Sequence, residues 1–465
     1  MTELKPIDPS TNVYQSGRFA PVDREVESSD LTVEGTVPTD LDGAFLRNGP
    51  NPKFTPLGSY TYPLEGDAMI HGVWLEGGQA RYKNRWVVTK GMLAEERAGR
   101  ALFGGLMTPA FVDQGLLGVD PDPGWPFKLD PFINIIRHGG RYLALGEGLP
   151  PYEVTAGLET VGLYDFDGGV TEGMGAHVRV DPASGDMVFI RYGVEAPFVT
   201  WGEIGADGRV SRQPAEVPGV DRSYMIHDFA ATPHYLVLVL GPATLDVNAM
   251  LTGGDVLKWE PELGTRVALI RRDGSEPIRW FEHDTFWAWH YANAYESGRD
   301  VILDFPRSSS PGFTTGEKMA GGFTRATLGL DTGGMHLSPF GNIGCEFPRF
   351  DERRTGLRHR YVTVASRTDN AALKPGEHDR LIRYDVETGV EKVVDMEFAI
   401  GEAVFAPRTG GTEELDGYYV TFATSLTDGR SALHIWDADD LSVRARILLP
   451  QRVPNGLHAS WLPSD

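Results

Sequence analysis

The segment HVRVDPASGD, residues 177–186, is the unit from which the fold can be predicted. A short run that favours β-structure, residues 177–180, precedes a turn that contains Asp181, Gly185 and Asp186. Aspartate side chains form local hydrogen bonds that favour turns, and glycine adopts positive φ without strain. The segment therefore predicts a β-hairpin.

Similar units recur from about Arg141 to the end of the chain. Other β-favouring runs lie at residues 141–145, 235–240, 381–385, 418–422 and 433–437. The repeat predicts an all-β fold, which could be a propeller, a large sandwich or a β-helix, because its period is too irregular to choose between them. Closed all-β folds are long, so we expect residues 1–465 to form a single domain.

Two stretches depart from this pattern. Residues 91–118 have apolar side chains at helical spacing, which predicts a helical excursion. Residues 308–338 are rich in Gly, Thr and Met, which favours a long loop region. In a propeller such insertions gather on one face, where function concentrates.

Composition narrows the classes of partner. The 43 Lys and Arg against 65 Asp and Glu give a formal net charge of −22, which disfavours nucleic acid and anionic lipid. The single cysteine, Cys345, excludes an intramolecular disulfide, and residues 1–10 lack the features of a signal peptide. We therefore expect a cytoplasmic protein. No apolar run approaches the ~20 residues that span a bilayer, so any membrane contact would be peripheral.

Four of the twelve histidines share an unusual setting. Each lies at the start or end of a predicted strand among apolar neighbours, whereas the others have settings typical of packed or exposed residues. A buried neutral imidazole needs a partner for both nitrogens, and a metal on one with a carboxylate on the other would satisfy it. Imidazole suits Fe(II), Zn(II) and Cu(II), so ligand type alone leaves the metal open. The four are His177, His227, His290 and His458.

At these residues the sequence resembles the carotenoid cleavage oxygenase family, which includes stilbene-cleaving and retinoid-isomerising members. The resemblance covers nearly the whole chain and rests on an ordered set of motifs. Ala68 departs from the pattern, because a glycine is usual there. The motifs are FLRNGPNP (45–52), EGDAMIHG (65–72), ALGEG (144–148), AH (176–177), IHDF (226–229), HYANAYE (290–296), EFPR (346–349), EAVFAPR (402–408) and GLH (456–458).

The resemblance implies a seven-bladed β-propeller with a helical and loop dome over the metal-bearing face. It implies one Fe(2+) per subunit, held by the four histidines, with O2 as co-substrate. Three glutamates of the family orient three of the ligands, and they match Glu147, Glu346 and Glu402. A carboxylate on the distal N–H fixes the tautomer and strengthens the metal-facing nitrogen. The expected activity is cleavage of a carbon–carbon double bond to give two carbonyl products.

Two departures concern the substrate. The tyrosine and lysine that bind the phenol in stilbene-cleaving members fall at Leu106 and Gly146, neither of which has a side-chain donor. We therefore expect a carotenoid or apocarotenoid in an apolar tunnel. A threonine that crowds the iron in many members falls at Ile133. Nearby aromatic residues could line the tunnel or belong to the core: Phe229, Trp287 and Trp289.

Other functions stay open on the sequence. The same chemistry could act on a stilbene or phenylpropenoid, and retinoid isomerisation without O2 is compatible with the four histidines. A binding scaffold with merely packed histidines would require the glutamate motifs to coincide by chance. The partner we expect is an apolar alkene, with peripheral membrane contact through the dome and no protein partner.

Overall fold

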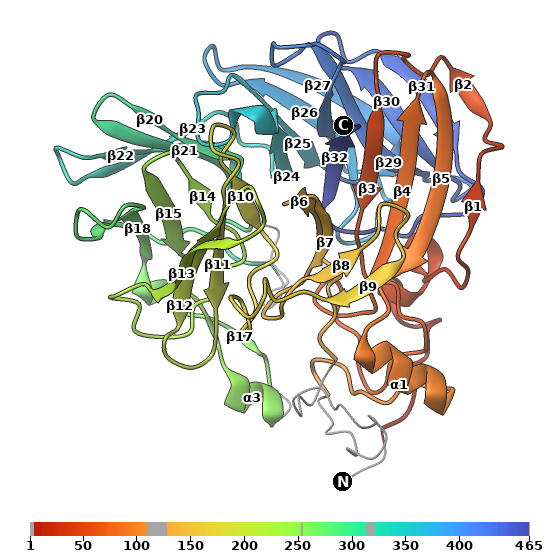
Figure 1. Cartoon of the computed structure of the whole chain (residues 1–465), viewed down its shortest axis with the longest axis horizontal. Coiled ribbons are helices and arrows are strands. Elements are labelled where there is room, and N and C mark those ends of the chain that lie inside the picture. The colour runs from red at the N-terminus through yellow and green to blue at the C-terminus, as the bar shows by residue number, and fades with distance from the viewer. Residues whose placement is uncertain (1–3, 109–127, 253, 313–320, 465) are drawn as a thin grey trace.

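The computed structural model describes residues 4–108, 128–252, 254–312 and 321–464, which fold mostly into β-sheet (Figure 1). All pairings between named strands in these residues are antiparallel. The prediction of a nearly all-β chain is thus confirmed. The hairpin predicted at 177–186 is also present, with Gly185 at φ 76° in its turn.

One sheet joins the two ends of the described chain. The C-terminal strand pairs with β3, so that Gly43 lies opposite Pro463 and Arg47 opposite Ala459. Its strands, in spatial order, are β1 (Glu27–Ser28), β5 (Gln79–Trp86), β4 (Met69–Glu76), β3 (Gly43–Arg47) and β32 (Ala459–Pro463).

Four four-stranded sheets and a two-stranded pair occupy the middle of the chain. The first two sheets are β6 (Asn134–His138), β7 (Arg141–Leu145), β8 (Tyr152–Val154), β9 (Thr160–Leu163), and β10 (Val178–Val180), β11 (Met187–Tyr192), β12 (Val199–Ile204), β13 (Val210–Glu216). The next two are β14 (Ala230–Ala231), β15 (Tyr235–Leu240), β18 (Thr265–Arg271), β19 (Arg279–His283), and β20 (Asn293–Ser297), β21 (Asp300–Ser308), β22 (Gly321–Gly329), β23 (Met335–Pro339). The pair is β16 (Ala243–Leu245) and β17 (Leu257–Trp259).

A nine-stranded sheet contains most of the C-terminal part. In the described residues its two halves are joined by strand pairing only where three residues at the end of β27 pair with β29. In spatial order the strands are β2 (Val33–Gly35), β31 (Val443–Leu448), β30 (Ser431–Asp437), β29 (Gly417–Ser425), β27 (Val390–Ile400), β26 (His378–Asp385), β25 (Tyr361–Ser366) and β24 (Cys345–Phe350), with β28 (Val404–Pro407) also on β29.

The strand alternation explains how the sheets pack. In β15 every residue is buried, but Leu236 and Leu238 enter one hydrophobic cluster whereas Val237 and Val239 enter another. Successive side chains of a strand point to opposite faces, so this sheet is covered on both sides. Continuous apolar runs are the sequence signature of such strands.

Helices are short in the described residues. They are α1 (Lys90–Ala98), α3 (Val247–Leu251) and the 3₁₀ turns η1 (Val13–Gln15), η2 (Gly17–Phe19), η3 (Pro261–Leu263) and η4 (Glu352–Arg354). The helical excursion expected over 91–118 is wrong for residues 99–108, because Gly99 at φ 66° ends α1 in the left-handed conformation. Residues 109–127 of that stretch lie outside the described residues.

The loop expected over 308–338 is also wrong where the chain forms β22 and most of β23. Two of its glycines, Gly321 and Gly322, allow close strand approach rather than a turn. A Cβ on Gly321 would lie 1.8 Å from the carbonyl oxygen of Arg307, and one on Gly322 would lie 2.1 Å from that of Gly341. Residues 313–320 lie outside the described residues.

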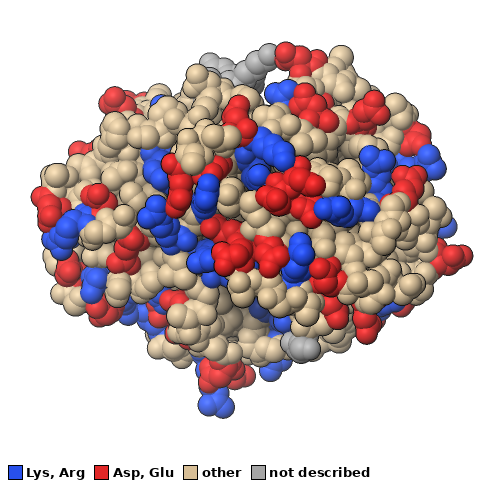
Figure 2. All heavy atoms as spheres, turned by 90° about the horizontal axis from the view of Figure 1, so that it is seen from above, with Lys and Arg blue, Asp and Glu red and all other residues tan. Residues whose placement is uncertain are grey.

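The surface carries both signs of charge despite the net charge of −22. On the face in Figure 2, lysine and arginine side chains alternate with aspartate and glutamate, without a broad basic patch. A face with interspersed positive and negative side chains lacks the basic patch by which proteins bind nucleic acid. Within the described residues, no helix has the length and apolar character that a membrane span requires.

We predict that Gly321→Ala destabilises the protein, because the added methyl group must push β22 away from β21. Overpacking of this kind costs about 1–3 kcal/mol. Gly334→Ala is the matched control, since its Cβ would meet only Thr332 Oγ1, at 3.6 Å. Thermal unfolding should show a lower midpoint for the first variant and an unchanged midpoint for the second; equal midpoints would contradict the packing argument.

Candidate metal centre

The four predicted histidines all precede the first strand of a sheet, or its edge strand. His177 directly precedes β10, and His458 directly precedes β32. His227 and His290 lie in the segments that lead into β14 and β20. Each therefore sits where a segment enters an edge strand, and the backbone pairing of that strand fixes its position.

The structure brings the four imidazoles into one cluster. One ligand atom from each ring lies within 4.8 Å of those of the other three. The Nε2 atoms of His177 and His227 are 3.2 Å apart, and those of His290 and His458 are also 3.2 Å apart. His177 and His458 are buried, and the other two are half-buried.

Glutamates lie behind three of the rings. Glu346 Oε2 is 2.6 Å from His290 Nδ1, and Glu402 Oε1 is 2.8 Å from His458 Nδ1. Each Nδ1 donates to a carboxylate, so each Nε2 presents a lone pair to the cluster. The sequence-predicted glutamates and histidines are thus brought together in pairs.

The third glutamate, Glu147, lies beside its histidine without forming a hydrogen bond. Glu147 Oε1 lies 3.0 Å from His227 Nδ1, but the angle is poor for a hydrogen bond, and neither atom has another partner in the described residues. Tyr192 lies beside Glu147, and burial together with this carboxylate raises the pKa of Tyr192 well above its usual value. Glu147 thus lies behind the His227 ring as the other two glutamates lie behind theirs, but without their hydrogen bond.

His177 has a different environment. Its nearest carboxylate oxygen is on Asp228, 3.8 Å from Nδ1, which is beyond hydrogen-bond distance. Asp228 instead accepts hydrogen bonds from Arg179 and from the backbone N–H groups of Phe229 and Tyr291. This aspartate therefore ties together the segments that carry three of the histidines.

Burial keeps two of the rings neutral. It lowers the pKa of His177 well below the usual value, and the neighbouring histidines act in the same direction. Burial also lowers the pKa of His458, to about 4. His290 differs: burial again disfavours the charged ring, but the Glu346 carboxylate outweighs it and raises the pKa. A neutral imidazole is the form that binds a metal.

Glu402 is held as a carboxylate by its neighbours. Burial alone would raise its pKa, but Arg349 and His458 lower it to about 2. The backbone N–H of Ala459 also donates to Glu402 Oε2, at 2.8 Å. The glutamate thus fixes both the ring of His458 and the start of β32.

These observations fit a bound metal ion. Because Nδ1 of both His290 and His458 donates to a glutamate, the neutral forms of these rings turn Nε2 lone pairs toward each other at 3.2 Å, and a cation between them would stabilise that arrangement. The donor set consists of four imidazoles, and the three glutamates behind the rings supply compensating negative charge. The cluster could therefore hold a divalent transition metal.

The predicted tunnel residues are placed less uniformly. The Trp289 ring lies 5.7 Å from that of His227, and the Trp287 ring lies 4.9 Å from that of Trp289. Phe229 is fully buried in a core cluster, with the Arg179 guanidinium 5.6 Å from its ring. Ile133 is also in the core, and its carbonyl accepts from the backbone N–H of His458.

Gly146 and Leu106 are both held by their backbones. A Cβ on Gly146 would lie 2.5 Å from the Asp130 carbonyl oxygen, so this position has no room for a side chain as the backbone stands. The backbone N–H of Leu106 donates to Glu65 Oε2, and its side chain is half-buried. Neither position supplies a side-chain donor.

Sequence reasoning missed four neighbours of the cluster. Asp228 and Arg179 form one ion pair, Arg349 contacts Glu402 at 3.4 Å, and the Phe347 ring lies 5.5 Å from that of His290. The signal was available, since Asp228 directly follows His227 and Phe347 directly follows Glu346. Their contacts become apparent only when the sheets are placed beside one another.

Curated relatives resemble this chain over nearly its whole length. A carotenoid cleavage oxygenase of Mycobacterium tuberculosis is 32% identical, covering 98% of this chain and 98% of the relative. An isoeugenol monooxygenase of Pseudomonas nitroreducens is 29% identical, covering 96% of this chain and 97% of the relative.

Solved structures agree with this likeness. The lignostilbene dioxygenase of Pseudomonas brassicacearum has a TM-score of 0.88 and 29% identity, and the match covers 98% of this chain and 99% of that chain. Cobalt-substituted apocarotenoid oxygenase of Synechocystis has a TM-score of 0.81 and 26% identity, covering 98% and 99%.

A family model gives the assignment directly. The model described as retinal pigment epithelial membrane protein matches residues 19–463. The match spans the four histidines of the cluster and the three glutamates behind them. The chain therefore belongs to the retinal pigment epithelial membrane protein family.

Proposed function

We propose that this chain is an iron-dependent oxygenase that cleaves a carbon–carbon double bond of a carotenoid or apocarotenoid with O2, giving two carbonyl products. The observation that carries the proposal is the convergence of four imidazole nitrogens, with a glutamate behind three of the rings. Relatives named for carotenoid, apocarotenoid and isoeugenol oxygenation support it.

The proposed cofactor is one Fe(2+) per subunit. When bound, ferrous iron would supply the redox chemistry by which O2 reacts with an alkene. His177, His227, His290 and His458 would hold the ion, and the glutamates would fix three of the rings and balance its charge. Arg349 would keep Glu402 ionised, and the buried setting would exclude water.

We also propose that the sheets form the seven blades of a single propeller. The nine-stranded sheet divides at the short pairing between β27 and β29, which leaves seven units of about four strands. In Figure 1 these units follow one another around the view, from β3–β5 on the right, through β6–β9, β10–β18 and β20–β23, to the C-terminal strands at the top. Pairing of β32 with β3 would close the ring.

The proposed substrate is an apolar polyene. Leu106 and Gly146 provide no side-chain donor for a phenol, and the packing at Gly146 leaves no space for one. The rings of Trp289 and Phe347 lie beside the histidines, where they would stack on an alkene. The assignment of Leu106, Ile133, Gly146, Phe229, Trp287 and Trp289 to a tunnel remains a prediction.

A membrane role also remains a prediction. Exposed apolar side chains in and before α1, Leu93 and Val88, would suit peripheral contact with a membrane that stores an apolar substrate. We also propose the cytoplasmic location that the sequence predicts.

A second candidate is the same reaction on a stilbene or phenylpropenoid. The likeness to a lignostilbene dioxygenase and to an isoeugenol monooxygenase favours it. A phenolic substrate would have to be bound by residues other than Leu106 and Gly146.

We predict that His227→Ala abolishes stoichiometric iron binding and alkene cleavage, because it removes one of four ligands and leaves Glu147 without its ring. His336→Ala is the matched control, since this exposed histidine of β23 lies outside the cluster. Plasma emission analysis of metal in purified protein and product chromatography provide the measurements. Wild-type iron content and turnover in His227→Ala would contradict the proposal.

We predict that an apocarotenoid is cleaved much faster than a hydroxystilbene, because no side-chain donor meets a phenol at Leu106 or Gly146. The reaction is run under ¹⁸O2, and mass spectrometry should find one labelled oxygen in each carbonyl product. Each aldehyde is incubated alone in the same buffer to correct for exchange with water. Faster hydroxystilbene cleavage would favour the second candidate, and label confined to one product would contradict the dioxygenase assignment.

A further inference from the structure

Three tryptophans form a continuous series of rings that starts at the histidine cluster. The Trp289 ring lies 5.7 Å from the His227 ring, with an interplanar angle of 80°. Trp287 lies 4.9 Å from Trp289, and Trp259 lies 6.1 Å from Trp287, again edge to face. These centroid separations are those of aromatic rings in contact.

The series runs through an apolar cluster that contains other oxidisable side chains. Trp287 and Trp289 are almost fully buried, at 2% and 7% exposure. They pack with Met225 and with the half-buried Tyr192, whose hydroxyl lies 3.5 Å from the Met225 sulfur. No described residue accepts a hydrogen bond from Trp287 Nε1, so no base lies in place to take its proton. A tryptophan that loses an electron there would keep its proton, which favours return of the electron.

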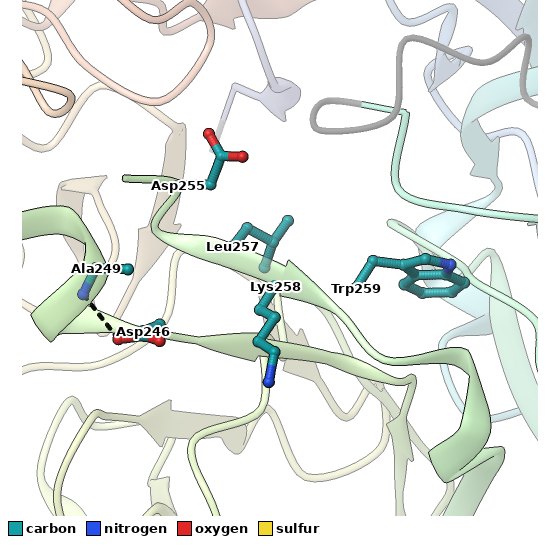
Figure 3. Close-up of a pocket in the computed structure, with 6 residues that line it drawn as sticks. All are labelled: Asp246, Ala249, Asp255, Leu257, Lys258 and Trp259. Carbon is teal, nitrogen blue, oxygen red and sulfur yellow. Dashed lines mark hydrogen bonds between the residues drawn. The ribbon is translucent and has the colours of Figure 1, made fainter. Parts of the chain in front are cut away.

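The other end of the series reaches solvent. Trp259 ends β17, is half-buried and lines a surface pocket of about 270 Å³. Figure 3 shows its ring beyond Leu257 and Lys258 on the same strand, at the edge of the pocket. None of the four histidines lines this pocket. A small molecule could therefore reach Trp259 without entering the metal centre.

We propose that Trp289, Trp287 and Trp259 form a relay that carries electrons from the surface to the metal centre when hydrogen peroxide reacts there in the absence of substrate. The inference rests on the proposed iron centre. Tryptophan is among the most readily oxidised side chains, and rings in contact exchange electrons readily. The relay would spare the ligand histidines from oxidation, because the oxidising equivalent moves to Trp259, where a small thiol can quench it.

The electron count closes with hydrogen peroxide as the oxidant. Peroxide takes up two electrons and two protons and is reduced to two waters. Ferrous iron supplies one electron and becomes ferric, and Trp289 supplies the other. An electron from Trp287 then reduces oxidised Trp289, and an electron from Trp259 reduces oxidised Trp287. The radical therefore ends on Trp259. A thiol then gives one electron to Trp259 and loses its proton to solvent, and the resulting thiyl radicals combine as a disulfide.

The test uses the iron-loaded full chain, without substrate, treated with one equivalent of hydrogen peroxide. Peptide mass spectrometry locates oxidised tryptophan, and freeze-quench electron paramagnetic resonance detects the indole radical. We expect oxidation at Trp259 well above that at Trp280, which is half-buried on β19 and outside the series. Added glutathione should abolish it, and zinc-loaded protein should not show it.

Variants separate a relay from direct attack by peroxide. In Trp287→Phe we expect oxidation at Trp259 to fall to the level of Trp280 and to rise at Trp289 and the ligand histidines. In Trp259→Phe, a substitution nearer the surface, the radical should remain on Trp287 and Trp289. Trp280→Phe is the matched control and should leave the wild-type pattern unchanged.

Three outcomes would overturn the relay: oxidation of Trp259 no greater than that of Trp280, equal oxidation in zinc-loaded protein, or equal oxidation in Trp287→Phe. Alkene cleavage and iron content are measured on the wild-type protein and on Trp280→Phe. Normal cleavage with any of these outcomes removes the relay alone, whereas absence of iron binding or cleavage removes the proposed function.

Discussion

The repulsion between imidazole lone pairs is the constraint on which this structure depends. His290 and His458 donate their Nδ1 protons to glutamates, so in their neutral forms the two Nε2 atoms, 3.2 Å apart, both present lone pairs. Such an arrangement is costly unless a cation joins them. The fold holds the rings in this arrangement. His177 and His458 directly precede edge strands, and pairing within the sheets fixes the position of those strands.

Fixing the rings requires a surrounding network of charge. Glu402 contacts His458, the backbone of Ala459 and Arg349, so one carboxylate sets a ring, the start of a strand and the position of a cation. Asp228 performs a similar role for the segments around His177, His227 and His290, through Arg179 and two backbone N–H groups. Partners of this kind orient metal ligands and tune their basicity.

The sequence could predict the members of this site better than their surroundings. The histidine and glutamate motifs were informative because each lies among apolar residues next to a predicted strand. In the structure, three of the histidines each lie beside one of the glutamates. The pairing of Asp228 with Arg179 joins residues 49 positions apart and depends on how two sheets pack, which no local pattern encodes.

Local ambiguity explains the errors in the fold. A glycine in the sequence can indicate either a turn or a close approach of two strands. Gly321 and Gly322 allow a close approach, so the predicted loop is the strand β22 in the structure. Helical spacing beyond Ala98 did not yield a helix in the described residues, because Gly99 ends α1. The strand at residues 235–240 was predictable because it is a continuous run of β-favouring apolar residues, and in the structure its alternate side chains enter two separate hydrophobic clusters.

The central claim is that the four Nε2 atoms share one iron ion. Anomalous diffraction from crystals of iron-loaded protein, measured on both sides of the iron absorption edge, tests it most directly. We expect a single strong peak at the edge, enclosed by His177, His227, His290 and His458, that disappears below the edge. Absence of a peak at that position, or a peak whose edge belongs to another metal, would contradict it.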